Sequence, residues 1–382
     1  MQKCRFFIKS FKKHQFFTLL LPAQLIIKIG NIKMESLFIT PTEISFITTN
    51  QCTAACANCC FQCNPKNKDR ISLAEMKQYV DDAISSYSTV KLLVLTGGEC
   101  FILGNDLNCI VKYATEKKLV VRVVTNGFWA NTYEKAFEKL KKLVEDGLTE
   151  INFSTGDEHQ EFVPFDNIIN GIIASLELNL TVVVNIELSD NSSFNLNDLK
   201  NDVRLEKYKD RIGKDLIIMC GRWIPFFKEQ KKKRESNKNV VYVEENKNRC
   251  ASLFRTISIS PTDDVYACCG LPVKYISYLR LGTLKKYSLQ YLYEYQFQDF
   301  IKIWLYTEGP KKILNFILNK RNEELIDTNK WHICQICAEI FKCEENIITL
   351  QQNYGEVFSN VMFKYELLKR KHLKIINKNI KL

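Results

Sequence analysis

Five cysteines lie close together between residues 52 and 63, and the first three have the spacing CxxxCxxC: Cys52, Cys56 and Cys59. Three thiolates at this spacing can close a tight loop around one face of an iron–sulfur cube, which leaves the fourth iron open to a ligand. A zinc knuckle is the alternative, with Cys60 or Cys63 as a fourth ligand, although zinc sites commonly use CxxC pairs. The spacing alone is a moderately specific signal, and together with the Gly97-Gly98-Glu99 turn downstream it favours an iron–sulfur site over zinc.

Further polar motifs follow apolar runs. Gly97-Gly98-Glu99 comes directly after the run 90–96, and glycines let a backbone approach a ligand closely. Thr125-Asn126-Gly127 follows the run 119–125, and the stretch 154–159 follows the next one. Side chains at the ends of neighbouring parallel strands meet at one edge of a sheet, so these motifs predict one shared site.

The elements that must position these motifs alternate between strand and helix from residue 43 to about 222. Ser72 and Glu75 form a capping box at the start of the first helix. Six strand–helix units predict a parallel sheet with right-handed crossovers and an active site at the carboxyl ends of its strands. The expected strands are 43–49, 90–96, 119–125, 150–154, 181–187 and 215–220, with helices near 72–84, 105–117, 131–146 and 166–178.

The cysteine spacing followed by a GGE turn resembles the radical S-adenosylmethionine (radical SAM) superfamily. The resemblance implies a partial (β/α)6 TIM-like barrel with a small Cys-rich C-terminal domain. It implies that Cys52, Cys56 and Cys59 hold a [4Fe–4S] cluster, and that the turn Gly97-Gly98-Glu99 binds the methionine amino group of S-adenosylmethionine. Asn58 departs from the family pattern, in which an aromatic residue commonly precedes the third cysteine. Cys60, Cys63 and Cys100 have no role that the resemblance requires.

The same resemblance assigns roles to polar residues on later strands. Asn126 and Ser154, and less directly Asn185 and Glu187, resemble the superfamily's ribose, carboxylate and adenine contacts. Asp157 and His159 are candidates for proton transfer or substrate binding, because a histidine titrates near neutral pH. The alternative is that they are a helix cap and a surface imidazole.

A second group of cysteines includes one before a predicted hairpin of residues 254–260 and 265–270, two on its return strand and three after it. It resembles the SPASM or twitch extension of these enzymes, which implies one auxiliary [4Fe–4S] cluster; a structural zinc ribbon is the alternative. Adjacent Cys268 and Cys269 would point to opposite faces of a strand, so only one should ligate. An acid, Asp263 or Asp264, stands where a glycine is usual. The predicted ligands are Cys250, Cys268, Cys334, Cys337 and Cys343.

Composition narrows the class of protein. The 382 residues include 15 cysteines in short spacings, which indicates metal thiolates in a reducing, cytoplasmic compartment, and not a disulfide-stapled secreted domain. The net charge is +11, but residues 1–33 carry seven Lys or Arg and no acid, and 364–382 carry seven with one acid. The body is therefore close to neutral, so a nucleic-acid groove across it is not indicated.

These observations predict five segments. Residues 1–33 are a basic and apolar leader; the run is too short to span a bilayer, and a misassigned start before Met34 is favoured over a signal peptide or anchor. Residues 34–227 form the core barrel, 228–249 a charged linker, 250–345 the auxiliary domain and 346–382 a basic helix. That helix is expected to dock on its own domain, although a membrane surface would also suit it.

The resemblance implies an oxidoreductase that reductively cleaves S-adenosylmethionine to a 5′-deoxyadenosyl radical, which abstracts a substrate hydrogen. A peptide or protein is the favoured substrate, with flavodoxin or ferredoxin as the electron donor. The alternatives are a radical enzyme acting on a small metabolite, or a non-catalytic iron–sulfur or zinc protein that binds a partner.

Overall fold

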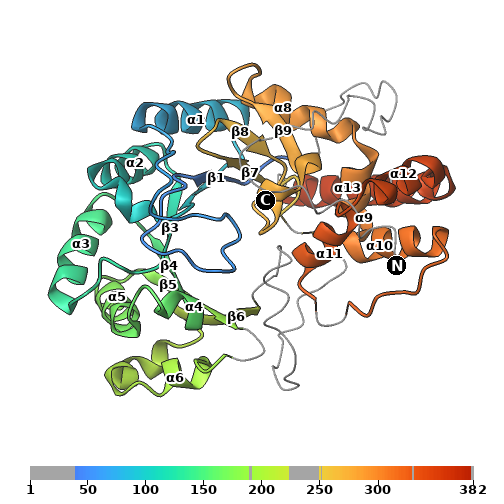
Figure 1. Ribbon diagram of the computed structural model, residues 1–382. Coiled ribbons are helices and arrows are strands. Elements are labelled where there is room, and N and C mark those ends of the chain that lie inside the picture. The colour runs from blue at the N-terminus through green and yellow to red at the C-terminus, as the bar shows by residue number, and fades with distance from the viewer. Residues whose placement is uncertain (1–38, 189–191, 223–248, 251, 329–330, 380–382) are drawn as a thin grey trace.

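A computed structural model describes residues 39–188, 192–222, 249–250, 252–328 and 331–379 (Figure 1). The predicted leader 1–33 and almost all of the linker 228–249 lie outside the described residues. A nine-stranded sheet runs through the described chain in the order β6-β5-β4-β3-β2-β1-β7-β8-β9. Strands β1 to β6 follow one another across the sheet and all pair in parallel, which confirms the predicted α/β half-barrel.

The first six strands and their helices lie close to the predicted positions. Ser72 and Glu75 form the predicted capping box at the start of α1. The strands are β1 (Glu43–Ile47), β2 (Leu92–Thr96), β3 (Val120–Thr125), β4 (Glu150–Thr155), β5 (Thr181–Leu188) and β6 (Leu216–Arg222), and the helices are α1 (Leu73–Ser86), α2 (Asn105–Glu116), α3 (Tyr133–Glu145), α4 (Asp157–Gln160), α5 (Phe165–Glu177) and α6 (Leu196–Lys200).

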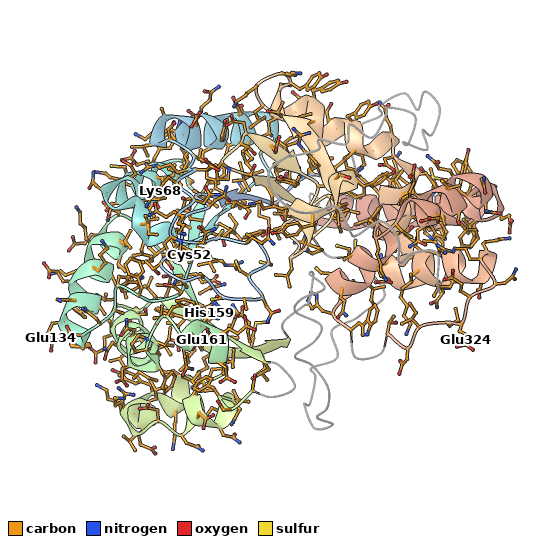
Figure 2. All side chains as sticks on the ribbon, viewed as in Figure 1. Cys52, Lys68, Glu134, His159, Glu161 and Glu324 are labelled. Carbon is orange, nitrogen blue, oxygen red and sulfur yellow. The ribbon has the colours of Figure 1, made fainter. Side chains whose placement is uncertain are left out.

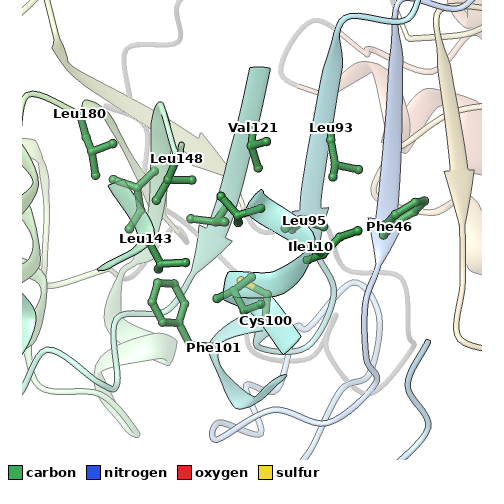
Figure 3. Packing of buried hydrophobic residues seen from close by; sticks show 14 of the residues in the cluster. Phe46, Leu93, Leu95, Cys100, Phe101, Ile110, Val121, Leu143, Leu148 and Leu180 are labelled. Atoms are coloured by element: carbon green, nitrogen blue, oxygen red, sulfur yellow. The ribbon is translucent and has the colours of Figure 1, made fainter. Parts of the chain in front are cut away.

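The main core lies between the sheet and its helices. Alternate strand residues such as Leu93, Leu95 and Val121 are buried and pack with helix residues such as Ile110 and Leu143 (Figure 3). Side chains of a strand alternate between its two faces, so the residues between them point to the opposite face of the sheet. That inner face carries the polar residues of the candidate site.

The second half of the chain extends the same sheet. Strand β7 pairs in parallel with β1 and is followed by two antiparallel strands, and the helices of this half enclose a second buried apolar cluster. The parallel pairing of β7 with β1 was not part of the hairpin prediction. The elements are β7 (Thr256–Ile259), β8 (Asp264–Tyr266), β9 (Arg280–Thr283), α8 (Leu289–Tyr295), α9 (Phe300–Glu308), α10 (Pro310–Lys320), α11 (Ile333–Ile340), α12 (Glu344–Asn353) and α13 (Gly355–Asn379).

Strand β8 is shorter than the predicted return strand of the hairpin. It ends at Tyr266, so Cys268 and Cys269 follow the strand instead of alternating across it. The prediction that Cys268 and Cys269 lie on a strand and point to its opposite faces was therefore wrong. The turn before β8 contains Asp263 at φ +60°, in the left-handed region where glycine is usual. Its carboxylate accepts a hydrogen bond from the Tyr79 hydroxyl at 2.6 Å, which helps to hold a non-glycine residue there.

The basic C-terminal helix α13 packs against its own half of the molecule. Val361 and Tyr365 are buried in the second apolar cluster, and the Lys364 ammonium pairs with the Glu308 carboxylate of α9. These contacts agree with docking on the chain itself. None of the helices in the described ranges is both long enough and apolar enough to cross a membrane.

Candidate active site

The loop between β1 and α1 carries the first cysteine group. Burial raises the pKa of Cys52 to about 11. Burial also raises the pKa of Cys56, with further contributions from the thiolate charges of Cys59 and Cys52. The three predicted ligands are therefore close enough for the charge on one to act on the others. Binding to a cluster would offset the raised pKa values, because iron holds each sulfur as a thiolate.

Cys59 differs from its two neighbours. A hydrogen bond from the Cys63 thiol, helped by backbone amides of residues 61–63, lowers the pKa of Cys59 to about 6 against the effect of burial. Cys63, which had no role in the sequence analysis, thus stabilises the thiolate form of a predicted ligand. Its own pKa is raised by the same hydrogen bond.

The cysteines do not surround a single-ion position. Among the described residues, no group of three or more His, Cys, Asp or Glu side chains is arranged to hold one metal ion. In an iron–sulfur cube each cysteine binds a different iron, so its thiolates do not converge on one point as zinc ligands do. Cys52, Cys56 and Cys59 lie near enough for their charges to interact, which is compatible with the predicted cluster.

The turn Gly97-Gly98-Glu99 is joined to the residues that lead into the cysteine loop. The Gly98 amide donates to the Thr49 carbonyl at 2.7 Å, and the Glu99 amide donates to the Gln51 carbonyl at 2.9 Å. A Cβ atom on Gly98 would lie 2.0 Å from the Gln51 oxygen, and one on Gly97 would lie 2.6 Å from the Thr49 oxygen. The two glycines are thus required by a close approach of two backbones.

The Glu99 carboxylate is completely buried and ties the ends of β2 and β3 together. It accepts hydrogen bonds from the Asn126 amide at 2.7 Å, the Thr125 hydroxyl at 2.9 Å and the Phe101 amide at 3.0 Å. Burial raises the pKa of Glu99 to about 7, against the lowering effect of these three bonds. The structure thus uses the Glu99 side chain inside the protein, while the backbone of the turn borders the cysteine loop.

Asn126 connects β3 to the cysteine loop. Its side-chain nitrogen lies 3.0 Å from the Thr53 hydroxyl oxygen and 3.6 Å from the Cys52 sulfur. Its side-chain oxygen accepts a hydrogen bond from the Phe128 amide at 3.1 Å. The structure therefore brings Asn126 together with the cysteine loop and the glycine turn, as a shared site requires.

Polar side chains from β4 and β5 line the inner face beside the loop. Ser154 and Asn185 are neighbours in the parallel register, and Glu187 lies two residues further along β5. The His159 Nδ1 atom lies 2.7 Å from the Glu187 carboxylate. Burial lowers the pKa of His159, but the Glu187 carboxylate, together with the charges of Cys59 and Glu158, makes the net shift upward. His159 and Cys52 are both labelled in Figure 2.

Asp157 is engaged in a structural contact. Its carboxylate accepts hydrogen bonds from the Ser193 amide at 2.7 Å, the Phe194 amide at 2.9 Å and the Ser193 hydroxyl at 3.0 Å. Asp157 thus fixes the segment after β5 and is not the predicted helix cap, since the N-cap residue of α4 is Gly156 and that of α6 is Asn195. His159, in contrast, has a side chain only 13% exposed and is not a surface imidazole.

Sequence reasoning missed Glu158, which lies between these two candidates. Its carboxylate accepts a hydrogen bond from the Asn58 backbone amide at 2.8 Å and a second from the Asn58 side-chain amide. The signal in the sequence was the polar residue Asn58 at a position where an aromatic residue is common. Asn58 is buried in the structure, and a buried amide needs a hydrogen-bond partner where an aromatic side chain does not.

The second cysteine group comes together between the segment after β8 and α11. Burial raises the pKa values of Cys268 and Cys337, and the charges of Cys250 and Cys334 raise both further. A Cβ atom on Gly270 would lie 3.3 Å from the Cys334 sulfur and 3.4 Å from the Cys268 sulfur. Cys250, Cys268, Cys334 and Cys337 are therefore close enough for their charges to interact, and Gly270 lies beside two of the four sulfurs.

The remaining two cysteines of this region have other neighbours. The Cys269 thiol lies 3.9 Å from the Thr256 hydroxyl oxygen on β7. Cys343 precedes α12, and its sulfur accepts a hydrogen bond from the Arg321 guanidinium at 3.8 Å. Between Cys268 and Cys269, the geometry favours Cys268 as a ligand.

A short segment after Gly270 joins the two cysteine groups. The Lys274 ammonium donates to the Asn50 side-chain oxygen at 2.8 Å and lies 5.7 Å from the centre of the Phe61 ring. Burial raises the pKa of Tyr275, and so do the charges of Cys59, Cys60 and Cys63. The second half of the chain thus contacts the first cysteine loop directly.

Comparison with known proteins gives weak but consistent similarities. No protein-family model matches the chain. It is 23% identical over 331 residues to the "Putative peptide biosynthesis protein YydG" of Bacillus subtilis (strain 168), which covers 84% of this chain and 98% of that protein.

Two solved structures resemble the fold. Native anSMEcpe with bound AdoMet and Cp18Cys peptide matches 86% of this chain and 99% of its own, at 10% identity and a TM-score of 0.49. BtrN in complex with AdoMet and 2-DOIA matches 73% and 91%, at 13% identity and a TM-score of 0.43. Scores this low carry no argument. The chain resembles the radical SAM superfamily in its cysteine spacing, in the Gly97-Gly98-Glu99 turn hydrogen-bonded to that loop and in its parallel half-barrel.

Proposed function

We propose that the protein is a radical SAM enzyme that modifies a peptide. The main observation is that two motifs lie side by side at the carboxyl ends of β1 and β2. They are the loop with Cys52, Cys56 and Cys59 and the glycine turn, which is hydrogen-bonded to the residues that lead into that loop. Three cysteine ligands leave one iron of a [4Fe–4S] cluster open. When bound there and reduced, S-adenosylmethionine supplies a 5′-deoxyadenosyl radical that takes a hydrogen atom from the substrate.

The chain's own residues would bind and orient the reactants. The backbone of the glycine turn lies beside the loop and suits the methionine amino group. Asn126, Ser154, Asn185 and Glu187 offer polar groups on the inner face for the nucleoside and carboxylate. The His159–Glu187 pair is the candidate for holding or moving a proton, because its imidazole is kept basic by the adjacent carboxylate. The sequence similarity to a peptide biosynthesis protein supports a peptide as the substrate.

The first test is metal content and cofactor cleavage under anaerobic conditions. The parent is expected to contain about eight irons and to form 5′-deoxyadenosine with dithionite, and a Cys52→Ala/Cys56→Ala/Cys59→Ala variant about four irons and no product. Cys109→Ala, a cysteine of α2 outside both groups, is the control and should match the parent. Zinc in place of iron, with no 5′-deoxyadenosine, would refute the proposal. Mass spectrometry of short peptides encoded beside the gene then tests the substrate class.

We further propose that Cys250, Cys268, Cys334 and Cys337 hold one auxiliary [4Fe–4S] cluster. Five cysteines were predicted, and a cluster of this type takes four. Cys268→Ala is therefore expected to lose about four irons, while Cys343→Ala keeps about eight, because its sulfur is engaged by Arg321. Loss of iron from the Cys343 variant and retention by the Cys268 variant would reverse this assignment.

A further inference from the structure

We infer that Glu158 is a positioning residue for the third cysteine of the cluster loop. The inference rests on the proposed cluster at Cys52, Cys56 and Cys59. Glu158 lies on α4, directly after β4, and reaches across to residue 58, which is adjacent to Cys59.

Asn58 donates two hydrogen bonds to the Glu158 carboxylate, and they fix the positions of both its backbone and its side chain. The Glu158 carboxylate accepts from the Asn58 backbone amide at 2.8 Å through one oxygen and from its side-chain amide through the other. The Asn58 side-chain oxygen is buried and has no hydrogen-bond partner among the described residues. Asn58 is thus held in its buried place through Glu158, and the direction of the chain entering Cys59 is set by the same carboxylate.

The neighbouring residues of α4 fix other segments, so the role is specific to Glu158. Asp157 binds the amides of Ser193 and Phe194, and His159 pairs with Glu187 on β5. Of the three residues, Glu158 is the one with described hydrogen bonds to the cluster loop, whereas His159 interacts with Cys59 through charge. Glu161, at the end of the same short helix, is exposed to solvent and serves as a matched carboxylate.

Glu158 also contributes charge. Its carboxylate is one of the groups whose negative charge acts on Cys56. Removing that charge while keeping the shape should make the cluster easier to reduce, because reduction adds a negative charge. Geometry and charge can therefore be tested separately with two substitutions at one position.

The experiment compares anaerobically reconstituted parent, Glu158→Ala, Glu158→Gln and Glu161→Ala, each in a Cys268→Ala background so that one cluster is observed. Glu158→Ala is expected to lose at least half of its iron and to broaden the electron paramagnetic resonance spectrum of the reduced cluster. Glu158→Gln should recover the iron, since its side-chain oxygen still accepts from the Asn58 amide, but should show a more positive midpoint potential. Glu161→Ala should match the parent in both.

Equal iron content and an unchanged spectrum in Glu158→Ala would overturn the inference, as would the same loss in Glu161→Ala. If Glu158→Ala does not fold, the Glu158→Gln variant decides the question. An unchanged midpoint potential would contradict the role of the Glu158 charge. Loss of iron would contradict the expectation that a glutamine oxygen can replace the carboxylate as the acceptor for Asn58. A parent with no iron would instead refute the proposed function and is distinguishable from these outcomes.

Discussion

Gly98 has no room for a side chain, because its Cα faces the backbone of the segment that leads into Cys52. A Cβ atom there would lie 2.0 Å from the Gln51 carbonyl oxygen, and a backbone cannot rotate away as a long side chain can. Gly98→Ala must therefore separate the glycine turn from the cysteine loop. We expect a loss of about 1–3 kcal/mol in the free energy of unfolding and a clear loss of iron from the first cluster.

Denaturant titration and iron analysis check this prediction. Gly355→Ala is the matched control, since a Cβ atom at Gly355 meets no atom within 4 Å. It should retain parental iron content. A Gly98→Ala variant with full iron content and parental stability would contradict the close approach described here.

For individual residues, the sequence predicted which residue types form the site but not which residue each of them contacts. Spacing alone selected Cys52, Cys56, Cys59 and the glycine turn, because those ligands and turns are local in the chain. The pairing of Glu158 with Asn58 spans 100 positions, and no local pattern specifies it. The glycines were expected for approach to a ligand, and the structure adds approach to a second backbone.

At the scale of elements, one carboxylate joins three segments on the outer side of the half-barrel. Glu177 at the end of α5 accepts hydrogen bonds from Tyr133 of α3 and from Tyr208 and Lys207 of the 3-10 helix Val203–Arg211. The Tyr133 hydroxyl, then that of Tyr208, lowers the pKa of Glu177 from 4.5 to about 2. The carboxylate is therefore charged at neutral pH.

A lowered pKa in the folded state means that the unfolded chain binds the proton more tightly. The stabilisation is present above pH 4.5 and is lost as the pH falls towards 2. We expect Glu177→Gln to cost roughly 1–2 kcal/mol at pH 7, less than the full pKa difference because the side chain is 31% exposed. The cost should shrink towards zero near pH 2. Urea denaturation of parent and variant across this range tests it, and a pH-independent difference would contradict it.

Element positions were predictable where hydrophobic alternation and caps are local, as in β2 to β5 and in α1. The boundaries of β8 were not, because the chain leaves the strand after Tyr266 and brings Cys268 near Cys250 and Cys334. The pairing of β7 with β1 also depends on contacts more than 200 positions apart, which single-segment patterns do not contain.

At the scale of the whole molecule, the two halves share one sheet and one set of cross-contacts. Strand β7 continues the parallel order beyond β1, Lys274 reaches the first cysteine loop, and the Tyr87 and Tyr293 rings lie 4.9 Å apart between α1 and α8. Such a molecule should unfold as one cooperative unit, although its two apolar clusters belong to separate parts of the sequence.

The Tyr79–Asp263 hydrogen bond offers a way to test this coupling. This hydrogen bond is buried and joins α1 to the turn before β8. The Asp263 carboxylate also forms an ion pair with the Lys285 ammonium at 3.1 Å. We expect Tyr79→Phe to lower the free energy of unfolding by about 1–3 kcal/mol, because the buried carboxylate loses a donor. Tyr113→Phe removes a comparable bond to Asp81 near the surface and should cost less than 1 kcal/mol.

Hydrogen exchange measured by mass spectrometry reads both halves at once. In the parent, peptides covering β1 and β7 should exchange at the same slow rate, because each strand loses its partner when the other opens. Tyr79→Phe should accelerate both by a similar factor, and Tyr113→Phe neither. Exchange in β7, β8 and β9 that runs ahead of β1 in the parent would mean that the second half opens by itself, and the single cooperative unit would then be wrong.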